Sequence, residues 1–288
     1  MLTERVQSWL DRGEFVEFRG RRLYVQRGGG KLPMLLLLHG FPSSSFDWGP
    51  LLDAHPDNAV LMFDCLGFGL SDKPADHEYT LGWQADAAEE LVRQAGSPPV
   101  FVVGHDMGTS VSTELMARDL RGELSFKMTG VLLFNGSILF HLATLTRSQK
   151  LLRSPLAKQA SRLSNKRVFV DEFSRLFSTG HPLSTDEADD QWALITYNDG
   201  QRITHLTINY TRERERYTDR WHGAFRDWPG PLSLAWGLQD PVANPRLLEG
   251  LLELRPGVPV QKLPELGHYP QIEDPAAIAA ALRAALEH

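Results

Sequence analysis

The stretch PVFVVGHDMG, residues 99–108, decides the fold class of this 288-residue chain. An apolar, β-branched run ends in a turn between Gly104 and Gly108, and helix-forming residues 111–117 follow. A strand that bends sharply into a helix, with one polar side chain at the bend, is the layout of a nucleophile elbow. The two glycines are expected to allow this bend, with Asp106 at its tip.

The identity of residue 106 sets the chemistry expected at this turn. A serine there would form acyl-enzymes from esters, whereas a carboxylate attacks an alkyl carbon and forms an alkyl ester. Asp106 therefore indicates epoxides or carbon–halogen bonds rather than ordinary esters or amides. The same pentapeptide also occurs as a plain strand-ending turn, so this interpretation depends on the rest of the chain.

Further apolar runs predict an α/β fold with a buried, mostly parallel sheet. Runs that are apolar on both faces are typical of strands covered on two sides, and amphipathic helices are expected between several of them. The expected strands lie at residues 15–26 (two strands with a turn at Gly20), 33–38, 59–63, 100–103, 130–134, 232–236 and 258–263, and expected helices lie at 86–95, 109–120 and 275–286.

This alternation stops between residues 139 and 228, where the chain is helix-like and rich in Leu, Arg, Phe and Trp. We predict a main domain formed by residues 1–138 and 229–288, with residues 139–228 inserted as a helical cap. The cap would cover the carboxyl edge of the sheet, where ligands of open α/β sheets bind.

Functional side chains are expected just beyond the strand ends at that edge. In chain order, Asp106, Asp240 and His268 match the nucleophile, acid and base of an α/β-hydrolase triad. Asp240 would fix the tautomer of His268, whose other nitrogen would take a proton from the water that hydrolyses the Asp106 ester. The backbone N–H groups of Phe41 and Met107 are expected to stabilise the resulting oxyanion.

Other polar residues near the strand ends have structural interpretations. His39 and Asp64 are expected to support loops, and Asn135 is interpreted as a cap or turn residue. A carboxylate near Asn135 is an open alternative to Asp240 as the acid. The alternating charges of residues 212–216 (RERER) are expected to form a solvated helix surface.

These motifs resemble the branch of the α/β-hydrolase superfamily that contains epoxide hydrolases and haloalkane dehalogenases. The resemblance implies an eight-stranded, mostly parallel sheet with helices on both faces and a helical cap. A narrower similarity is to the mesoderm-specific transcript protein and its bacterial relatives, whose substrates are poorly defined. The similar segments are HGFP (39–42), DCLGFGLSDKP (64–74) and GHDMG (104–108) for the branch, and residues 39–48, 198–200 and 268–275 for the narrower group.

Two departures from the better-known families concern the leaving group. Haloalkane dehalogenases usually place a halide-binding tryptophan directly after the nucleophile, and this chain has Met107, which lacks a strong donor. One dehalogenase subgroup has an asparagine where this chain has Phe41. Trp192, Trp221 or Trp228 could supply an indole instead, but core packing is the role we expect for each.

Epoxide hydrolases of this branch use two cap tyrosines as donors to the epoxide oxygen. Residues 209–212 (NYTR) resemble the segment that carries one of them, but Thr211 occupies the place of that tyrosine. Tyr210 and Tyr197 are therefore the candidate substrate-facing residues of the cap.

Composition limits the partners and the compartment. The net charge of −6 gives no electrostatic reason to expect nucleic acid. The single cysteine, Cys65, excludes an intrachain disulfide, and no apolar run approaches the about 20 residues that a membrane span needs. With no signal-like N-terminus, we expect a cytoplasmic protein. No metal-ligand spacing or dinucleotide motif appears, so no metal or cofactor is expected.

The sequence thus predicts a hydrolase that opens an epoxide or similar small apolar electrophile through an ester on Asp106, with water as the second substrate. One alternative is a haloalkane dehalogenase with an atypical halide site. Another is a hydrolase-fold protein that binds a ligand or regulates a partner with little turnover. The substrate, the stereochemistry and the oligomeric state stay open, and a homodimer is one option.

Overall fold

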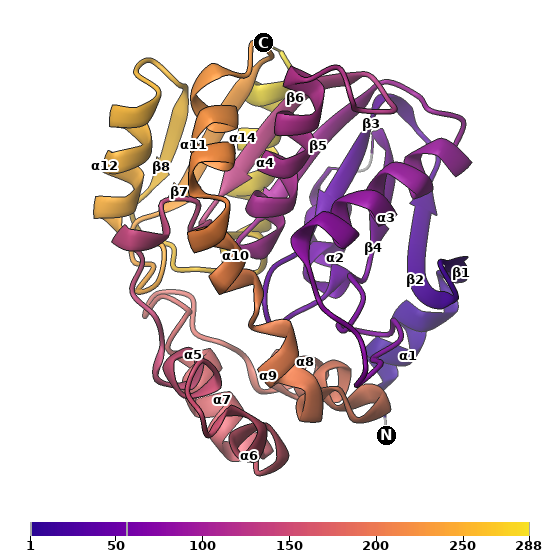
Figure 1. The fold of residues 1–288 in the computed structure, drawn as a ribbon, viewed down its shortest axis with the longest axis vertical. Coiled ribbons are helices and arrows are strands. Elements are labelled where there is room, and N and C mark those ends of the chain that lie inside the picture. Colours follow the sequence, from indigo (N-terminus) through magenta and orange to yellow (C-terminus); the bar gives the residue numbers. More distant parts are fainter. Residues whose placement is uncertain (1, 56, 288) are drawn as a thin grey trace.

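The computed structural model describes residues 2–55 and 57–287, which form an eight-stranded sheet with helices on both faces (Figure 1). The strands are β1 (Glu14–Phe18), β2 (Arg21–Gly28), β3 (Lys31–Leu38), β4 (Asn58–Phe63), β5 (Val100–His105), β6 (Met128–Phe134), β7 (Leu232–Gly237) and β8 (Val260–Leu263). Their order is β1-β2-β4-β3-β5-β6-β7-β8. The β1–β2 and β2–β4 pairs are antiparallel, and all the other pairs are parallel. The predicted mostly parallel α/β sheet is confirmed.

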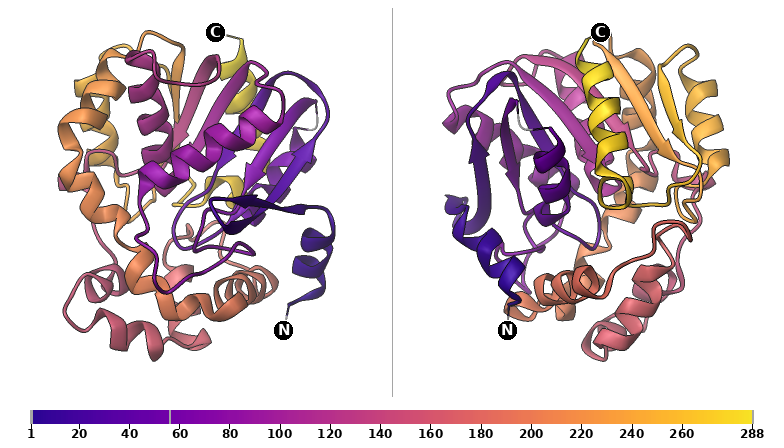
Figure 2. Two further views of the ribbon diagram at one scale, coloured as in Figure 1. Left: turned by 45° about the vertical axis from the view of Figure 1, so that its right-hand side comes forward. Right: turned by 180° about the vertical axis from the view of Figure 1, so that it is seen from behind.

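Helices outside the segment between β6 and β7 cover the two faces of the sheet. They are α1 (Glu4–Asp11), the 3-10 helix η1 (Ser45–Trp48), α2 (Gly49–Ala54), α3 (Leu81–Gln94), α4 (Met107–Leu120), α12 (Pro245–Leu254), α13 (Pro270–Glu273) and α14 (Pro275–Leu286). Alternate side chains of a strand point to opposite faces. Accordingly, Leu36 and Val102 pack in a core with α3, α4 and α12, whereas Leu37 and Val103 pack in a second core with α1, α2 and α14. Figure 2 shows α14 on the back of the sheet.

Helix α4 differs from the amphipathic helix expected at residues 109–120. Every residue from 107 to 117 is buried. The helix lies between the sheet and neighbouring helices, so it has no solvent-facing side over this length. Its hydroxyls are satisfied within the helix: Ser112 Oγ donates to the Gly108 carbonyl at 2.8 Å and Thr113 Oγ1 to the Thr109 carbonyl at 2.6 Å.

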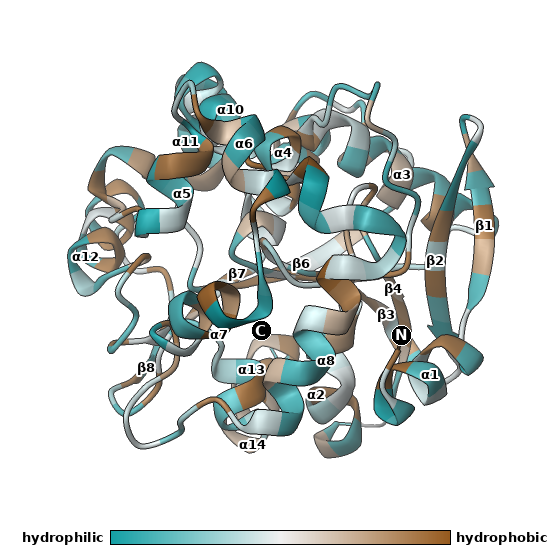
Figure 3. Ribbon diagram, turned by 90° about the horizontal axis from the view of Figure 1, so that it is seen from below, coloured by the Kyte–Doolittle hydropathy of each residue, from teal (hydrophilic) through white to brown (hydrophobic). Residues whose placement is uncertain are grey.

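All the regular elements described between β6 and β7 are helical. They are η2 (Phe140–Leu142), α5 (Arg147–Leu152), α6 (Ala157–Arg162), α7 (Lys166–Ser174), α8 (Thr185–Thr196), η3 (Tyr197–Ile203), α9 (Thr204–Thr207), α10 (Tyr210–Arg216) and α11 (Thr218–Asp227). Helices α5, α6 and α7 lie together at the end of the molecule away from the C-terminus, whereas α11 packs against α4 (Figures 1 and 2). Figure 3 looks at this end from below, with the helices coloured by hydropathy. None of the helices in the described part of the chain has both the length and the apolar content to cross a bilayer.

Candidate functional site

Asp106 connects β5 to α4 at a strained bend. Its backbone has φ 45° and ψ −109°, a conformation that non-glycine residues rarely adopt, and its side chain is buried. Neither Gly104 nor Gly108 has a positive φ. Each is needed instead because a side chain at its position would clash with neighbouring atoms. A Cβ on Gly108 would overlap the backbone carbonyl of Leu38, and one on Gly104 would lie 2.8 Å from the Gly108 carbonyl. The close packing of β3, β5 and α4 therefore requires both glycines.

The carboxylate of Asp106 has a backbone donor from the loop after β3. The Phe41 N–H donates to Asp106 Oδ2 at 2.9 Å. Gly40 makes this approach possible, because a Cβ there would lie 2.8 Å from Asp106 Cβ. Met107, the other predicted backbone donor, is buried as the first residue of α4. The loop after β3 thus meets the carboxylate through the Phe41 N–H, and the donor role of the Met107 N–H stays a prediction.

Arg214 is a site residue that the sequence reasoning missed. Its side chain is 2% exposed, and its Nη2 lies 2.8 Å from the Asp106 backbone oxygen and 3.5 Å from Asp106 Oδ1. Its Nε donates to Ser110 Oγ at 2.8 Å. A cationic side chain from α10 therefore holds the elbow and its carboxylate together.

The expectation that residues 212–216 form a solvated surface is wrong for two of them. Glu213 and Arg214 are buried, whereas the other three are exposed. Helix α10 turns about 100° per residue, so two adjacent positions face the sheet domain while the rest face water. Glu213 accepts from the Leu81 N–H at 2.6 Å, which docks α10 on the start of α3.

Several charges determine the ionisation of Asp106. Burial alone would raise its pKa, but the charges of Arg214 and His268 and the Phe41 N–H lower it, and the net shift is downward. The pKa of Asp106 thus lies below the ordinary value for aspartate. A carboxylate that stays ionised while buried is suited to act as a nucleophile.

His268 and Asp240 form a buried hydrogen-bonded pair. His268 Nδ1 lies 2.6 Å from Asp240 Oδ2, and the side-chain amide of Asn135 donates to the same oxygen at 2.8 Å. Asp240 Oδ1 accepts from the backbone N–H groups of Val242 and Ala243 at 2.6 and 3.0 Å. Burial would lower the pKa of His268, but Asp240 reverses this and raises it. Asn135 therefore supports Asp240 directly.

His105, beside the nucleophile position, is a second residue that the sequence reasoning missed. Its Nε2 lies 2.7 Å from the His268 carbonyl oxygen, and its Nδ1 lies 3.2 Å from Gln271 Nε2. Burial, together with the charge of His268, lowers the pKa of His105 to about 3, so the ring is neutral. A neutral His105 can accept from Gln271 and donate to His268, which positions the loop that carries the imidazole. Its place inside the elbow motif was the available signal.

The two candidate tyrosines lie in different surroundings. Tyr210 is buried beside the site: its ring centroid lies 5.3 Å from that of Phe41 and 4.7 Å from the Arg214 guanidinium. Gln149 Nε2 donates to its hydroxyl at 3.3 Å. Tyr197 instead lies under Lys73, whose Nζ is 5.2 Å from its ring centroid. The structure therefore places Tyr210, but not Tyr197, next to Asp106 and its partners.

Of the three tryptophans considered as halide donors, Trp221 and Trp228 pack in the core, as expected, whereas Trp192 is only half-buried. The Trp221 indole donates to Glu114 at 3.0 Å, and the Trp228 indole donates to Asp119 at 2.6 Å. Trp192 packs against Phe169, with ring centroids 5.5 Å apart.

His39 and Asp64 also have the expected loop-supporting roles. His39 Nε2 accepts from the Cys65 N–H at 2.9 Å. Asp64 accepts from the backbone N–H groups of Ser45 and Leu70 at 2.8 and 2.6 Å. These bonds hold the loops after β3 and β4 around the site.

A mostly apolar cavity of about 320 Å³ reaches His268 from the helical segment. Its lining includes Phe41, Leu176 and Val242 together with side chains from α5, α6 and α7. No group of three or more His, Cys, Asp and Glu side chains suited to a metal ion is found in residues 2–55 and 57–287. The site thus consists of a buried carboxylate, a carboxylate-paired imidazole and an apolar space beside them.

Residues 35–281 match the model of the Alpha/beta hydrolase family. The chain belongs to this family. LipZ of Mycobacterium tuberculosis is 50% identical over 281 residues, which cover 98% of each chain. The mesoderm-specific transcript homolog protein of Homo sapiens is 34% identical over 291 residues, covering 95% of this chain and 85% of that protein.

A solved structure extends the similarity to the fold of haloalkane dehalogenases. The dehalogenase DbeA from Bradyrhizobium elkani matches with a TM-score of 0.78 at 20% sequence identity, covering 96% of this chain and 98% of that one. At this identity the likeness concerns the fold. Together, the comparisons confirm the family resemblance inferred from the motifs.

Proposed function

We propose that this chain is a hydrolase that opens an epoxide through a covalent alkyl ester on Asp106 and then hydrolyses that ester with water activated by His268. The observation that carries the proposal is an ionised, buried carboxylate at a strained elbow, beside an imidazole paired with Asp240. A serine hydrolase needs a hydroxyl at this position, whereas a carboxylate there can attack an sp³ carbon.

In the first step an Asp106 oxygen attacks a ring carbon, the carbon–oxygen bond of the epoxide breaks, and the ring oxygen takes up a proton. We assign Tyr210 as the donor to that oxygen, because it is buried beside Phe41 and Arg214. Burial, with the charge of Asp106, raises the pKa of Tyr210, so the phenol keeps its proton.

In the second step His268 takes a proton from water, and the hydroxide oxygen attacks the ester carbonyl of Asp106. The tetrahedral oxyanion would accept from the N–H groups of Phe41 and Met107. The Phe41 N–H already donates to the carboxylate at 2.9 Å. Collapse of this intermediate breaks the bond between the carbonyl carbon and the alkyl oxygen, and protonated His268 gives its proton to that oxygen as the diol leaves. The Asp106 carboxyl group then returns a proton to the Tyr210 phenolate, which restores both residues.

We further propose that residues 139–228 act as the cap that shapes the substrate space. Helices α5, α6 and α7 line the cavity that reaches His268, and α10 carries Tyr210 and Arg214 to the elbow. The apolar cavity favours an apolar electrophile as the substrate. Arg214 and Glu213 join this segment to the sheet domain at the reacting carboxylate.

The test is intact-protein mass spectrometry on a His268→Gln variant after incubation with a panel of epoxides and haloalkanes. This variant should keep alkylation but lose ester hydrolysis, so it should gain the mass of a whole epoxide, mapped by peptide analysis to Asp106. The matched control is the same variant with Asp106→Asn added, which should gain no mass.

Three other results would contradict the proposal in different ways. Addition of an alkyl group without its halogen would assign the chain to haloalkane dehalogenases. An adduct on another residue, or one retained in the Asp106→Asn control, would remove Asp106 as the nucleophile. Failure of every substrate to form an adduct, with wild-type protein also inactive on the panel, would favour a binding protein.

A further inference from the structure

Residues 147–167, which form α5, α6 and the start of α7, have a charge opposite to that of the rest of the chain, whereas the remainder of α7 carries Asp171 and Glu172. Residues 147–167 carry seven Lys and Arg side chains and no Asp or Glu. The segment therefore contributes +7 to a chain whose net charge is −6, which leaves −13 for the remainder. The seven are Arg147, Lys150, Arg153, Lys158, Arg162, Lys166 and Arg167.

Most of these cations have no carboxylate partner in the part of the chain that the structure describes. Arg153 pairs with Glu215 at 2.8 Å and Lys166 with Asp189 at 2.7 Å. The other five are exposed, and none has a carboxylate oxygen within 4.0 Å among the residues that the structure describes. The positive potential of this surface is therefore available to an external anion.

Large apolar side chains are exposed on the same segment. Leu163 is 77% exposed and Leu156 is 59% exposed, and Leu151 and Val168 are also exposed. Monomeric soluble domains seldom cluster such side chains at the surface without an interaction to bury them. Leu151, Leu163 and Val168 also line the cavity that reaches His268, so the exposed apolar surface continues into the site.

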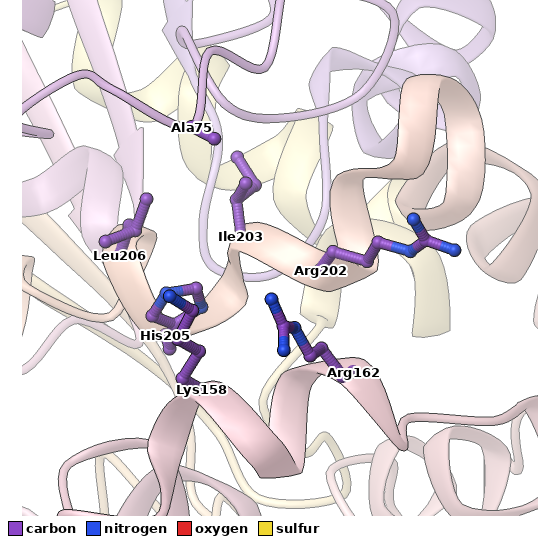
Figure 4. A pocket seen from close by; sticks show the side chains of 7 residues that line it. All are labelled: Ala75, Lys158, Arg162, Arg202, Ile203, His205 and Leu206. Carbon is purple, nitrogen blue, oxygen red and sulfur yellow. The ribbon is translucent and has the colours of Figure 1, made fainter.

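A second cavity, of about 530 Å³, lies between α6 and the η3–α9 segment and is basic (Figure 4). Lys158, Arg162, Arg202 and His205 line it; in Figure 4 the first two and His205 lie near one another, and the Arg202 side chain extends away from them. Arg202 pairs with the exposed Asp199, with Nε and Oδ1 3.4 Å apart. Such a cluster of donors suits a phosphate group, which accepts several charge-assisted hydrogen bonds.

Hydrogen bonds hold this basic cavity beside the apolar one. Ser161 Oγ lies 2.9 Å from Thr204 Oγ1 and accepts from the His205 N–H at 3.0 Å. Ser161 and Thr204 line the apolar cavity, and the residues next to them in sequence, Arg162, Ile203 and His205, line the basic one, so this α6–α9 contact lies between the two cavities. A phosphate site and an apolar entrance are thus fixed next to each other.

We propose that the surface formed by α5, α6 and α7 binds an anionic phospholipid bilayer, with a lipid phosphate in the basic cavity and the exposed leucines in the acyl boundary. Basic side chains interspersed with exposed aliphatic ones are the pattern of a peripheral membrane surface. Nucleic acid would satisfy the cations but would leave the leucines in water. Docking in this orientation turns the mouth of the apolar cavity toward the lipid, so an apolar substrate enters from the bilayer.

The test is co-sedimentation of the full chain with vesicles of phosphatidylcholine alone and of equal parts phosphatidylcholine and phosphatidylglycerol. The chain should pellet only with the anionic vesicles, and added salt should weaken binding. Replacing Lys158 and Arg162 together by Gln should reduce the partition coefficient on the order of 20-fold, at about 5-fold per charge. Leu163→Ser should also reduce it, which adsorption by charge alone would not produce.

The matched control replaces Arg121 and Lys127 by Gln. Both are exposed cations of the sheet domain, outside the α5–α7 surface, and the net charge changes equally. This control should bind as the wild type does. An equal loss in the control, failure to pellet with the anionic vesicles, or binding to double-stranded DNA in their place would overturn the proposal. Circular dichroism of each variant shows that the fold is retained, and these outcomes do not depend on Asp106 chemistry.

Discussion

Replacing Arg214 by Met should destabilise the protein mainly by leaving the Asp106 carboxylate buried without its counter-ion. The guanidinium lies 3.5 Å from Asp106 Oδ1, and both side chains are 2% exposed. At an effective dielectric constant of about 20, two unit charges at this distance attract by about 5 kcal/mol. Measured costs of removing one member of a buried pair are about 3–5 kcal/mol, which we expect for Arg214→Met.

A double-mutant cycle separates this charge effect from lost hydrogen bonds. Arg214 also donates to the Asp106 carbonyl and to Ser110, and these bonds contribute about 1 kcal/mol each. In an Asp106→Asn background no buried carboxylate loses its counter-ion. Arg214→Met should then lower the free energy of unfolding by only about 2 kcal/mol, the contribution of the two hydrogen bonds. The expected coupling energy is therefore roughly 1–3 kcal/mol.

The assay is urea unfolding of the wild type, the two single variants and the double variant near neutral pH. Arg118→Met is the matched control, because Arg118 pairs with Asp86, Glu89 and Glu114 rather than with the elbow. It should show no coupling to Asp106→Asn. If Arg214→Met costs the same in both backgrounds, the guanidinium acts by packing and hydrogen bonding alone, and the electrostatic reasoning is refuted.

The same pair predicts a pH dependence. The pKa of Asp106 is lowered in the folded protein, since Arg214 and its neighbours outweigh burial. Asp106 therefore contributes stability above the unfolded pKa of about 4, and this contribution is lost as the pH falls through the lower folded value. Without Arg214 that pKa should rise, so the stability deficit of Arg214→Met should shrink on acidification. A deficit that grows on acidification would contradict this sign.

Three further predictions concern other parts of the site. The ester hydrolysis that we propose needs neutral His268, whose pKa is raised, so the rate should increase as the pH rises through that pKa. Asp240→Asn should move this limb of the kcat–pH profile to lower pH, and an unmoved limb would contradict the assignment. Gly108→Ala should lower stability by about 3 kcal/mol or more in thermal unfolding, because its Cβ overlaps a β3 carbonyl, whereas Gly82→Ala, which meets no atom within 4 Å, should not. Tyr210→Phe should slow epoxide turnover roughly 100-fold with unfolding unchanged, and an unaltered kcat would make Tyr210 a packing residue.

The sheet was predictable because its signals are local. Buried parallel strands are apolar on both faces, so the runs that become β3 and β5 can be read without knowledge of their neighbours. The positions of Asp106, Asp240 and His268 after successive strands follow from the same reading, since parallel strands bring their carboxyl ends to one edge. The bond between His268 and Asp240 matches the order of these residues along the chain.

The errors occurred where one contact joins distant segments. The run at residues 212–216 has the composition of a solvated helix, and only the docking of α10 on the elbow buries Arg214 against a residue 108 positions earlier. Likewise, the glycine motif located the bend correctly, but we expected Gly104 and Gly108 to provide the unusual backbone conformation. The residue with the positive φ is Asp106 itself. The close approach of β3 and α4 sets that geometry.

Local periodicity, turn residues and the chain order of the polar strand ends were therefore sufficient to predict the fold class and to nominate Asp106, Asp240 and His268 as candidate site residues. Tertiary structure alone decided which cation faces the carboxylate, which amide supports Asp240 and where the apolar cavity opens. The physical reason is that hydrophobic periodicity is a pattern of residues close together in the sequence. A buried ion pair instead depends on how two elements that are distant in the sequence pack against each other.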